Sequence, residues 1–165
     1  MERVNLRSRE REHVTHQPGK QGDLIVNLKD APKIALGVGT TIQLLRYSEE
    51  TGDWVLFVKM DPGATFAPHW HLGHGQYFIT KGELIYDVGS APVGTYGYEP
   101  IGSRHSEARC EVETEYLFLG HGAVAFTDEN NEIRFILNHE FLRDVNQGLV
   151  HSDVSNASLE AEAAA

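Results

Sequence analysis

The chain has 165 residues, of which 41% are hydrophobic and 23% are charged, and its formal net charge is −10. This length and composition predict one globular domain, and the negative charge argues against nucleic acid or an anionic membrane as a partner. The single cysteine, Cys110, excludes an intrachain disulfide. Because the N-terminus is highly charged and no apolar run is long enough to span a membrane, we expect a soluble cytoplasmic protein.

The first 22 residues are polar and have no apolar period, so residues 1–22 are predicted to form an N-terminal arm. Short strand-like runs separated by turn signals follow and predict one all-β domain over residues 23–150. A polar tail occupies residues 151–165. The expected strands cover residues 24–28, 40–47, 54–60, 65–71, 76–80, 83–88, 95–100, 105–112, 115–120, 123–127 and 132–137. The GSAPVG segment at 89–94 is predicted to be a turn.

Two local patterns support this organisation. Residues 138–148 form the one predicted helix, with Asn138 as its N-cap and Gly148 as its end. The run 54–60 alternates as a strand with one buried face should. One face carries Val55, Phe57 and Lys59, and the opposite face carries Trp54, Leu56, Val58 and Met60.

Three histidines suggest a metal site: His69 and His71 in one predicted strand, and His105 in a later one. Residues two apart in a strand point to the same face, so the first two imidazoles project together. A neighbouring strand could bring His105 alongside them. Neutral imidazole is the commonest protein ligand for mid-row transition metals, so the sequence predicts a metal centre. A set of core histidines in a metal-free barrel is the alternative.

The spacing around these histidines resembles the two consecutive motifs of the cupin superfamily. The matching residues are Gly63, His69, His71 and Gly82 in the first motif, and Gly94, Pro100, Gly102 and His105 in the second. The second motif departs only at its last position, where the family usually has Asn and this chain has Arg109. The resemblance implies a double-stranded β-helix, the jelly-roll barrel of cupins, with a metal inside and one short C-terminal helix outside.

Cupins commonly add a glutamate after the His-x-His pair, and this chain lacks it. Gly75 falls at the usual glutamate position, beside Gln76, and no carboxylate lies between His71 and Gly82. Three imidazoles leave the charge of a dication uncompensated, which favours an anionic chelating oxygen ligand and leaves coordination positions open. His74, in a glycine-flanked loop, is the alternative nitrogen ligand.

A closer resemblance covers residues 38–135, including the runs QYFITKG and GTYGYEPIGSRH. These runs resemble the acetylacetone dioxygenase family, iron(II) cupins that cleave β-dicarbonyls with O₂. The resemblance implies one metal held by His69, His71 and His105, with iron(II) expected and zinc, nickel or manganese as alternatives. It also implies that Glu99 and Tyr77 orient water and substrate, and that the protein is a homo-oligomer, either a dimer or a tetramer.

The chain departs from this family at three positions around the site. A family glutamate, arginine and threonine are replaced by Gln76, Asp87 and Ala108, and Arg104 is a candidate to replace the lost cation. The predicted function is a dioxygenase that cleaves a C–C bond of a β-dicarbonyl or related enolisable ketone, with an anionic chelating small molecule and O₂ as substrates. Two alternatives remain: a metal cupin with isomerase or hydrolase chemistry, and a metal-holding cupin that binds or senses, as in anti-sigma factors.

Overall fold

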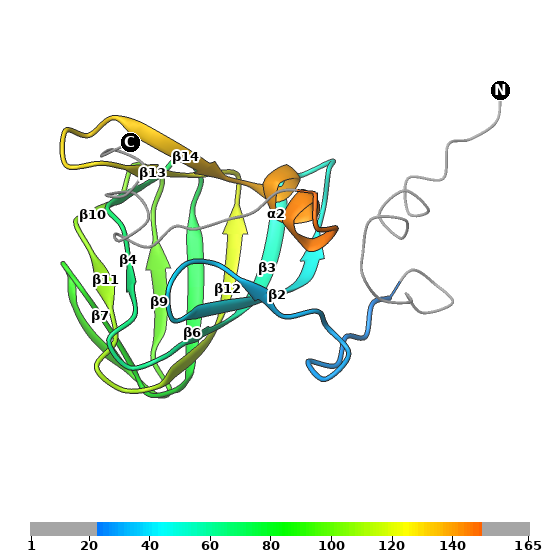
Figure 1. Cartoon of the computed structure of the whole chain (residues 1–165), viewed down its shortest axis with the longest axis horizontal. Coiled ribbons are helices and arrows are strands. Elements are labelled where there is room, and N and C mark those ends of the chain that lie inside the picture. The colour runs from blue at the N-terminus through cyan, green and yellow to red at the C-terminus, as the bar shows by residue number, and fades with distance from the viewer. Residues whose placement is uncertain (1–22, 150–165) are drawn as a thin grey trace, which may run out of the picture.

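The computed structural model describes residues 23–149, in which antiparallel strands form three sheets around one core (Figure 1). The predicted arm at 1–22 and tail at 151–165 lie outside the described residues. The six-stranded sheet has the order β1 (Ile34–Ala35), β2 (Thr40–Tyr47), β3 (Asp53–Met60), β12 (Thr114–His121), β6 (Gly75–Lys81) and β9 (Tyr96–Glu99).

Two four-stranded sheets complete the barrel. The first has the order β10 (Arg104–His105), β5 (His69–His71), β13 (Val124–Thr127) and β14 (Ile133–Leu137). The second has the order β4 (Thr65–Phe66), β11 (Ala108–Arg109), β7 (Glu83–Tyr86) and β8 (Gly89–Pro92). The first of these sheets carries all three predicted metal-binding histidines.

Strand β3 shows why this sequence forms sheets. Its residues alternate strictly between half-buried and buried, as predicted. The buried Leu56 pairs with Leu44 on β2 and with Phe118 on β12, so side chains from three strands pack together. Burying such apolar side chains stabilises the fold by roughly 25 cal/mol per Å² of apolar surface.

The close packing of Trp54 against Gly120 depends on the absence of a side chain at that glycine. The Trp54 indole N–H donates to the carbonyl oxygen of Gly122 at 2.8 Å, and its ring stacks on Phe118 with centroids 5.4 Å apart. A Cβ added at Gly120 would lie 2.1 Å from Cζ2 of Trp54. The hydrogen bond and the ring stacking hold the indole in this position.

We therefore expect Gly120→Ala to lower the free energy of unfolding by about 2 kcal/mol, the usual scale for overpacking a core. Urea denaturation of the purified variant measures the change. Gly94→Ala is the control, because Gly94 has a φ of +85° but no atom within 4 Å of the added Cβ. Its backbone strain alone should cost about 1 kcal/mol. A Gly120 variant as stable as the parent protein would contradict the packing described here.

Two predicted local structures are wrong, and the predicted strands 65–71 and 105–112 are each divided into two short strands. Residues 24–28 form no strand beyond an isolated bridge at Leu24, because the carbonyl of Leu28 is bound by the side-chain amide of Gln43 rather than by a ladder. Residues 89–94 are not a turn throughout, since Gly89–Pro92 forms β8 and pairs with β7. Strand β8 lies at a sheet edge, where a proline is tolerated because its missing N–H faces no partner strand.

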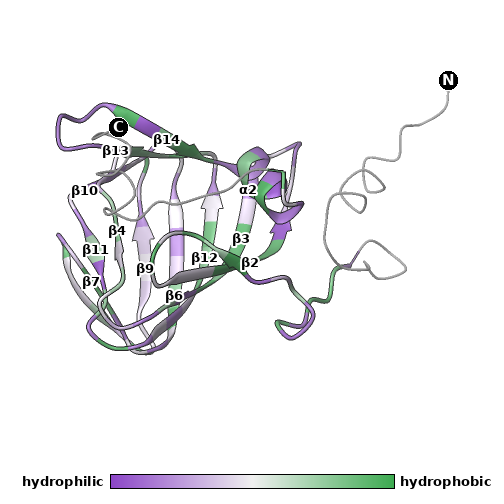
Figure 2. Cartoon of the chain, viewed as in Figure 1, coloured by the Kyte–Doolittle hydropathy of each residue, from purple (hydrophilic) through white to green (hydrophobic). Residues whose placement is uncertain are grey.

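The single predicted helix is confirmed as α2 (His139–Asn146). Oδ1 of Asn138 accepts a hydrogen bond from the Phe141 backbone N–H at 2.9 Å, as an N-cap should. Leu142 and Val145 are buried, and Figure 2 shows the resulting mixture of hydrophobic and hydrophilic residues along the helix. The predicted all-β class with one short C-terminal helix is thus confirmed. Within residues 23–149, no helix has the length and hydropathy needed to cross a membrane.

Candidate metal centre

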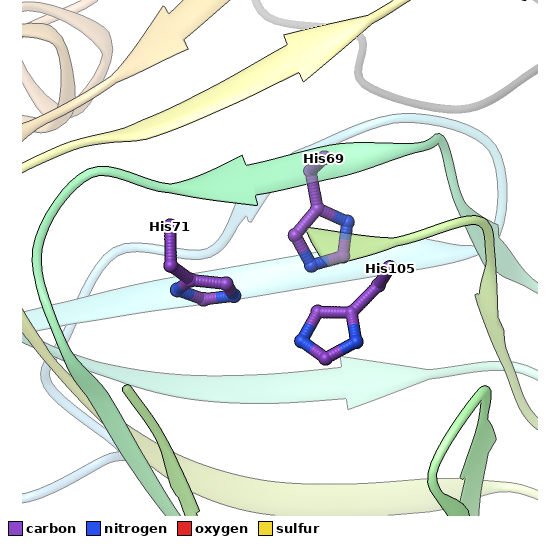
Figure 3. Close-up of side chains that lie close together, drawn as sticks. All are labelled: His69, His71 and His105. Carbon is purple, nitrogen blue, oxygen red and sulfur yellow. The ribbon is translucent and has the colours of Figure 1, made fainter. Parts of the chain in front are cut away.

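The structure brings His69, His71 and His105 together, as the spacing predicted (Figure 3). His69 and His71 point from β5 to the same side, and β10 pairs with β5 so that His105 lies opposite His69. One nitrogen from each ring lies within 4.8 Å of the other two. The ring centroids are 5.0 to 5.4 Å apart. Three imidazoles therefore face one common space.

A tight turn places His105 beside the first pair. The N–H of Gly102 donates to the carbonyl of His71, and the N–H of His71 donates to the carbonyl of Ser103, both at 2.8 Å. These two bonds fix the turn against β5. Gly102 has a φ of +85°, a conformation that favours glycine, which gives a physical reason for glycine at this place in the motif.

All three imidazoles are neutral at neutral pH. Burial is the main cause, since it lowers the pKa of His69 to about 4 and that of His71 to about 3. Burial also lowers the pKa of His105. The neighbouring imidazoles contribute in the same direction at His69 and His71, because like charges would repel. The neutral form is the one that binds metal ions.

Several nitrogens in this cluster have no hydrogen-bond partner. Both ring nitrogens of His71 and Nδ1 of His105 are buried and unpaired. In His69, Nδ1 donates to the carbonyl of Ala67 at 2.9 Å, which leaves Nε2 as the lone-pair atom. A buried polar atom without a partner costs about 1–3 kcal/mol. A metal ion shared by the three rings would take a lone pair from one nitrogen of each ring, so the donor set fits a divalent transition metal.

Glu99 is a buried carboxylate beside the cluster. Its Oε2 lies 3.2 Å from Nε2 of His71, and its Oε1 lies 3.5 Å from Nε2 of His105. Burial raises the pKa of Glu99 to about 7. Gly75 is its partner across β6 and β9, and a Cβ at Gly75 would lie 3.0 Å from Oε2 of Glu99 and 2.6 Å from the Phe118 ring. The carboxylate near the metal site thus comes from position 99, and position 75 leaves room for it.

Tyr77, the other predicted catalytic residue, lies in the core and does not line the cavity next to the histidines. Its hydroxyl oxygen lies 2.5 Å from that of Tyr86, and the Tyr86 ring lies 5.0 Å from His105. Tyr77 therefore reaches the cluster through Tyr86. Sequence reasoning missed Tyr86, because only the pairing of β7 with β11, which carries Ala108, brings it to the site.

The remaining candidates lie outside the histidine cluster. His74 stacks on His121 with centroids 5.0 Å apart. Gln76 accepts a hydrogen bond from the hydroxyl of Tyr96 at 2.8 Å. The guanidinium of Arg104 lies 4.4 Å from the centre of the Trp70 ring. Within residues 23–149, none of the three joins the group that could hold the metal.

A small cavity of about 70 Å³ adjoins the cluster inside the barrel. His69, His71 and Glu99 are its polar walls, and the rest is almost entirely apolar, including Leu56, Phe118 and Phe126. Phe66 lines it as well, whereas Trp70 lines a separate outer cavity. The interior therefore offers a small, largely apolar space in which electrostatic interactions are strong.

Metal should stay bound at lower pH than ordinary histidines would allow. A histidine in the unfolded chain has a pKa of about 6.5, and the pKa values of His69 and His71 in the folded protein are lower. Between these values the folded state binds fewer protons than the unfolded state. The stability of the apo-protein therefore declines as the pH falls below about 6.5. In the folded protein, protons compete with metal only nearer pH 4. We expect zinc content to change little from pH 7 to about 5 and to fall steeply below about 4.5.

Equilibrium dialysis followed by metal analysis measures this loss. Circular dichroism on the same samples separates metal release from unfolding. Release centred near pH 6 from a folded protein would contradict buried histidine ligands.

The sequence and the fold of this chain are similar to those of known cupins. The family model described as the ChrR cupin-like domain matches residues 21–125. The acetylacetone-cleaving enzyme of Acinetobacter johnsonii is 34% identical over 101 residues, which cover 58% of this chain and 66% of the enzyme, just under two thirds of its length. The crystal structure of an acetylacetone dioxygenase from that organism has a TM-score of 0.70 at 25% identity, covering 82% of this chain and 96% of the other. A crystal structure from Methylibium petroleiphilum PM1 shares the fold, with a TM-score of 0.71 at 24% identity over 82% and 99% of the two chains.

Proposed function

Because this chain belongs to the ChrR cupin-like domain family and has the predicted cupin jelly-roll fold, we propose that it is a metal-dependent dioxygenase. The proposed reaction breaks a C–C bond of a β-dicarbonyl or related enolisable ketone with O₂ and gives a carboxylate and a second carbonyl product. The observation that carries the proposal is the cluster of three neutral histidines beside an apolar cavity. The identity with the acetylacetone-cleaving enzyme supports it.

Iron(II) is the proposed metal, and His69, His71 and His105 would hold it. When bound, it would supply a Lewis acid for the substrate and a redox centre through which electrons of the substrate pass to O₂. Three imidazole nitrogens also bind zinc, nickel or manganese, so these metals are the alternatives to iron. Three neutral ligands leave the dication charge for an anionic substrate to compensate, which supports the enolate of a dicarbonyl as the bound form.

Glu99 is proposed to hold the proton that the substrate loses. Its Oε2 is buried and without a hydrogen-bond partner, and it lines the same cavity as His69 and His71. It can therefore accept the proton from the carbon between the two carbonyls as the enolate forms. Tyr77 is proposed as a positioning residue, because its hydroxyl contacts that of Tyr86.

Anaerobic reconstitution with iron(II), followed by oxygen uptake across a panel of β-dicarbonyls and aryl hydroxy-ketones, tests the proposal. We expect uptake of one O₂ per substrate cleaved with iron and none with zinc. An iron-loaded protein that consumes no O₂ with any member of the panel would refute the dioxygenase assignment. Product formed without O₂ would instead support isomerase or hydrolase chemistry.

A metal-holding sensing cupin is the second candidate, because the matching family is described by the ChrR domain. It predicts metal-dependent binding of a protein partner without turnover. The oxygen-uptake panel separates the two, since a sensing cupin would hold iron and leave the substrates intact.

We further propose that the protein acts in the cytoplasm as a homo-oligomer, a dimer or a tetramer, with neither nucleic acid nor membrane as a partner. The net charge of −10 supports the exclusion of nucleic acid and anionic membranes, and the free thiol of Cys110 suits a reducing compartment. The oligomer is proposed from the family resemblance alone. Sedimentation analysis of the purified chain determines the oligomeric state.

A further inference from the structure

The histidine cluster adjoins a second cavity of about 550 Å³ on the outer side of β5 and β10. We call this cavity the vestibule; the residues that matter here are His69, Asp87, Arg104, His105, Ser106 and Glu129. His69 lines both the vestibule and the inner cavity. His71 and His105 are only 2% and 4% exposed, whereas His69 is half-buried. The vestibule is therefore the side from which a ligand reaches the cluster.

The two cavities differ greatly in size. The inner cavity of about 70 Å³ has room for about five waters on the scale of roughly 10–15 Å³ for each. It can hold a small acyl group beside the histidines. Any larger substituent on a chelating dicarbonyl must then lie in the vestibule, so the charges there act on that substituent.

Asp87 is the vestibule carboxylate that is fixed near the histidines. It accepts hydrogen bonds from the backbone N–H of Ser106 at 2.6 Å and from the Ser106 hydroxyl at 2.5 Å. These bonds lower the pKa of Asp87, so it is ionised at neutral pH. Its charge also interacts with both His69 and His105.

The other charges of the vestibule do not cancel Asp87. Asp128 is neutralised by Arg134, whose Nε donates to its carboxylate at 2.9 Å. Glu129 is exposed on the β13–β14 connection. Arg104 alternates with His105 on β10 and lies over the Trp70 ring, away from the side that the histidines face. The charge nearest to the histidine cluster is therefore negative.

We propose that the vestibule discriminates against dicarbonyls with a negatively charged substituent, so that the natural substrate carries a neutral or cationic one. Asp87 is the principal specificity-determining residue, with Glu129 as a second contributor. This inference rests on the proposed function for its substrate class. The inference adds a requirement on the charge of the remote substituent of the substrate. The metal ligands do not impose this requirement, because they do not contact that substituent.

Two ligands that differ in one remote charge test the proposal: 4,6-dioxoheptanoate and its methyl ester. Cobalt(II)-loaded protein is titrated with each, and binding is followed by the visible absorption of the metal, without turnover. We expect the ester to bind about five-fold more tightly, because like charges about 4 Å apart at an exposed site repel by about 1 kcal/mol. Raising the salt concentration from about 0.05 to 0.5 M should shrink this ratio, because exposed charges are screened.

Asp87→Asn should reduce the ratio at least about three-fold, and the double variant with Glu129→Gln should bring it near one. Glu111→Gln is the matched control, because its carboxylate is 74% exposed and lines neither cavity. It should leave the ratio unchanged. If Asp87→Asn does not fold, Glu129→Gln and the salt dependence of the parent protein still test the inference.

Equal binding of the two ligands, tighter binding of the carboxylate through Arg104, or binding of neither would overturn the inference. The proposed function is judged separately by oxygen uptake with iron. Charge discrimination in the cobalt protein without oxygen uptake would refute the dioxygenase and leave the vestibule inference standing. Oxygen uptake at equal rates with both ligands would support the dioxygenase and refute the vestibule inference.

Discussion

Replacing His71 by alanine is expected to remove the metal site, lowering bound metal from about one ion per chain to below about 0.1 after dialysis. His71 is 2% exposed and both of its ring nitrogens are unpaired. Within the described residues, the only group with the geometry to hold a metal is His69, His71 and His105. Zinc affinity, measured by competition with a chelator, should weaken at least about 100-fold.

His74→Ala is the matched control for this experiment. His74 is three positions further along, and its ring stacks on His121 rather than joining the cluster. Its removal should change the zinc affinity by less than about two-fold. A His71 variant that keeps one ion per chain, or a His74 variant that loses it, would show that the ligands are assigned wrongly.

Glu99→Gln is expected to lower turnover by about ten-fold or more while leaving metal content within about a factor of two. Glutamine keeps the shape of the side chain and removes its ability to take up a proton. Because Oε2 of Glu99 lies 3.2 Å from His71, the change acts next to the metal without removing a ligand. Steady-state kinetics on an active substrate, with metal analysis of the same sample, measures both quantities.

The pH dependence of stability gives a second readout on this variant. The folded pKa of Glu99, about 7, lies above its unfolded value, so the buried carboxylate increasingly destabilises the apo-protein as pH rises from about 4.5 to about 7. Glu99→Gln removes this effect and should raise the thermal midpoint of the apo-protein at pH 8 more than at pH 5. Glu115→Gln, on the outer side of β12 near Lys59, is the control and should alter neither turnover nor metal content. Unchanged turnover in Glu99→Gln would mean that the carboxylate takes no part in the reaction.

The sequence predicted the elements whose signals are local. The His-x-His pair needed only strand periodicity, and β3 showed its buried face through simple alternation. The cap at Asn138 likewise follows from chemistry within one helical turn. In each case, the interacting groups are close together in the chain.

The remaining features depend on contacts between distant segments. Tyr86 reaches His105 only because β7 pairs with β11, and the vestibule residues named above come from β5, β10 and three connections. The failed strand at 24–28 depends on Gln43, whose side-chain amide binds the carbonyls of Leu28 and Ala31. The sequence of each segment alone does not indicate which distant residues it will contact.

Gly75 has a consequence for how this type of site can change during evolution. A glutamate at position 75, where cupins commonly have one, would place its Cβ 2.6 Å from the Phe118 ring and 3.0 Å from the carboxylate of Glu99. A glutamate at 75 therefore requires the Phe118 ring and the Glu99 carboxylate to move, and it would bring a second carboxylate into the same buried space. We expect a substitution at position 75 to be tolerated better when position 99 carries a smaller side chain.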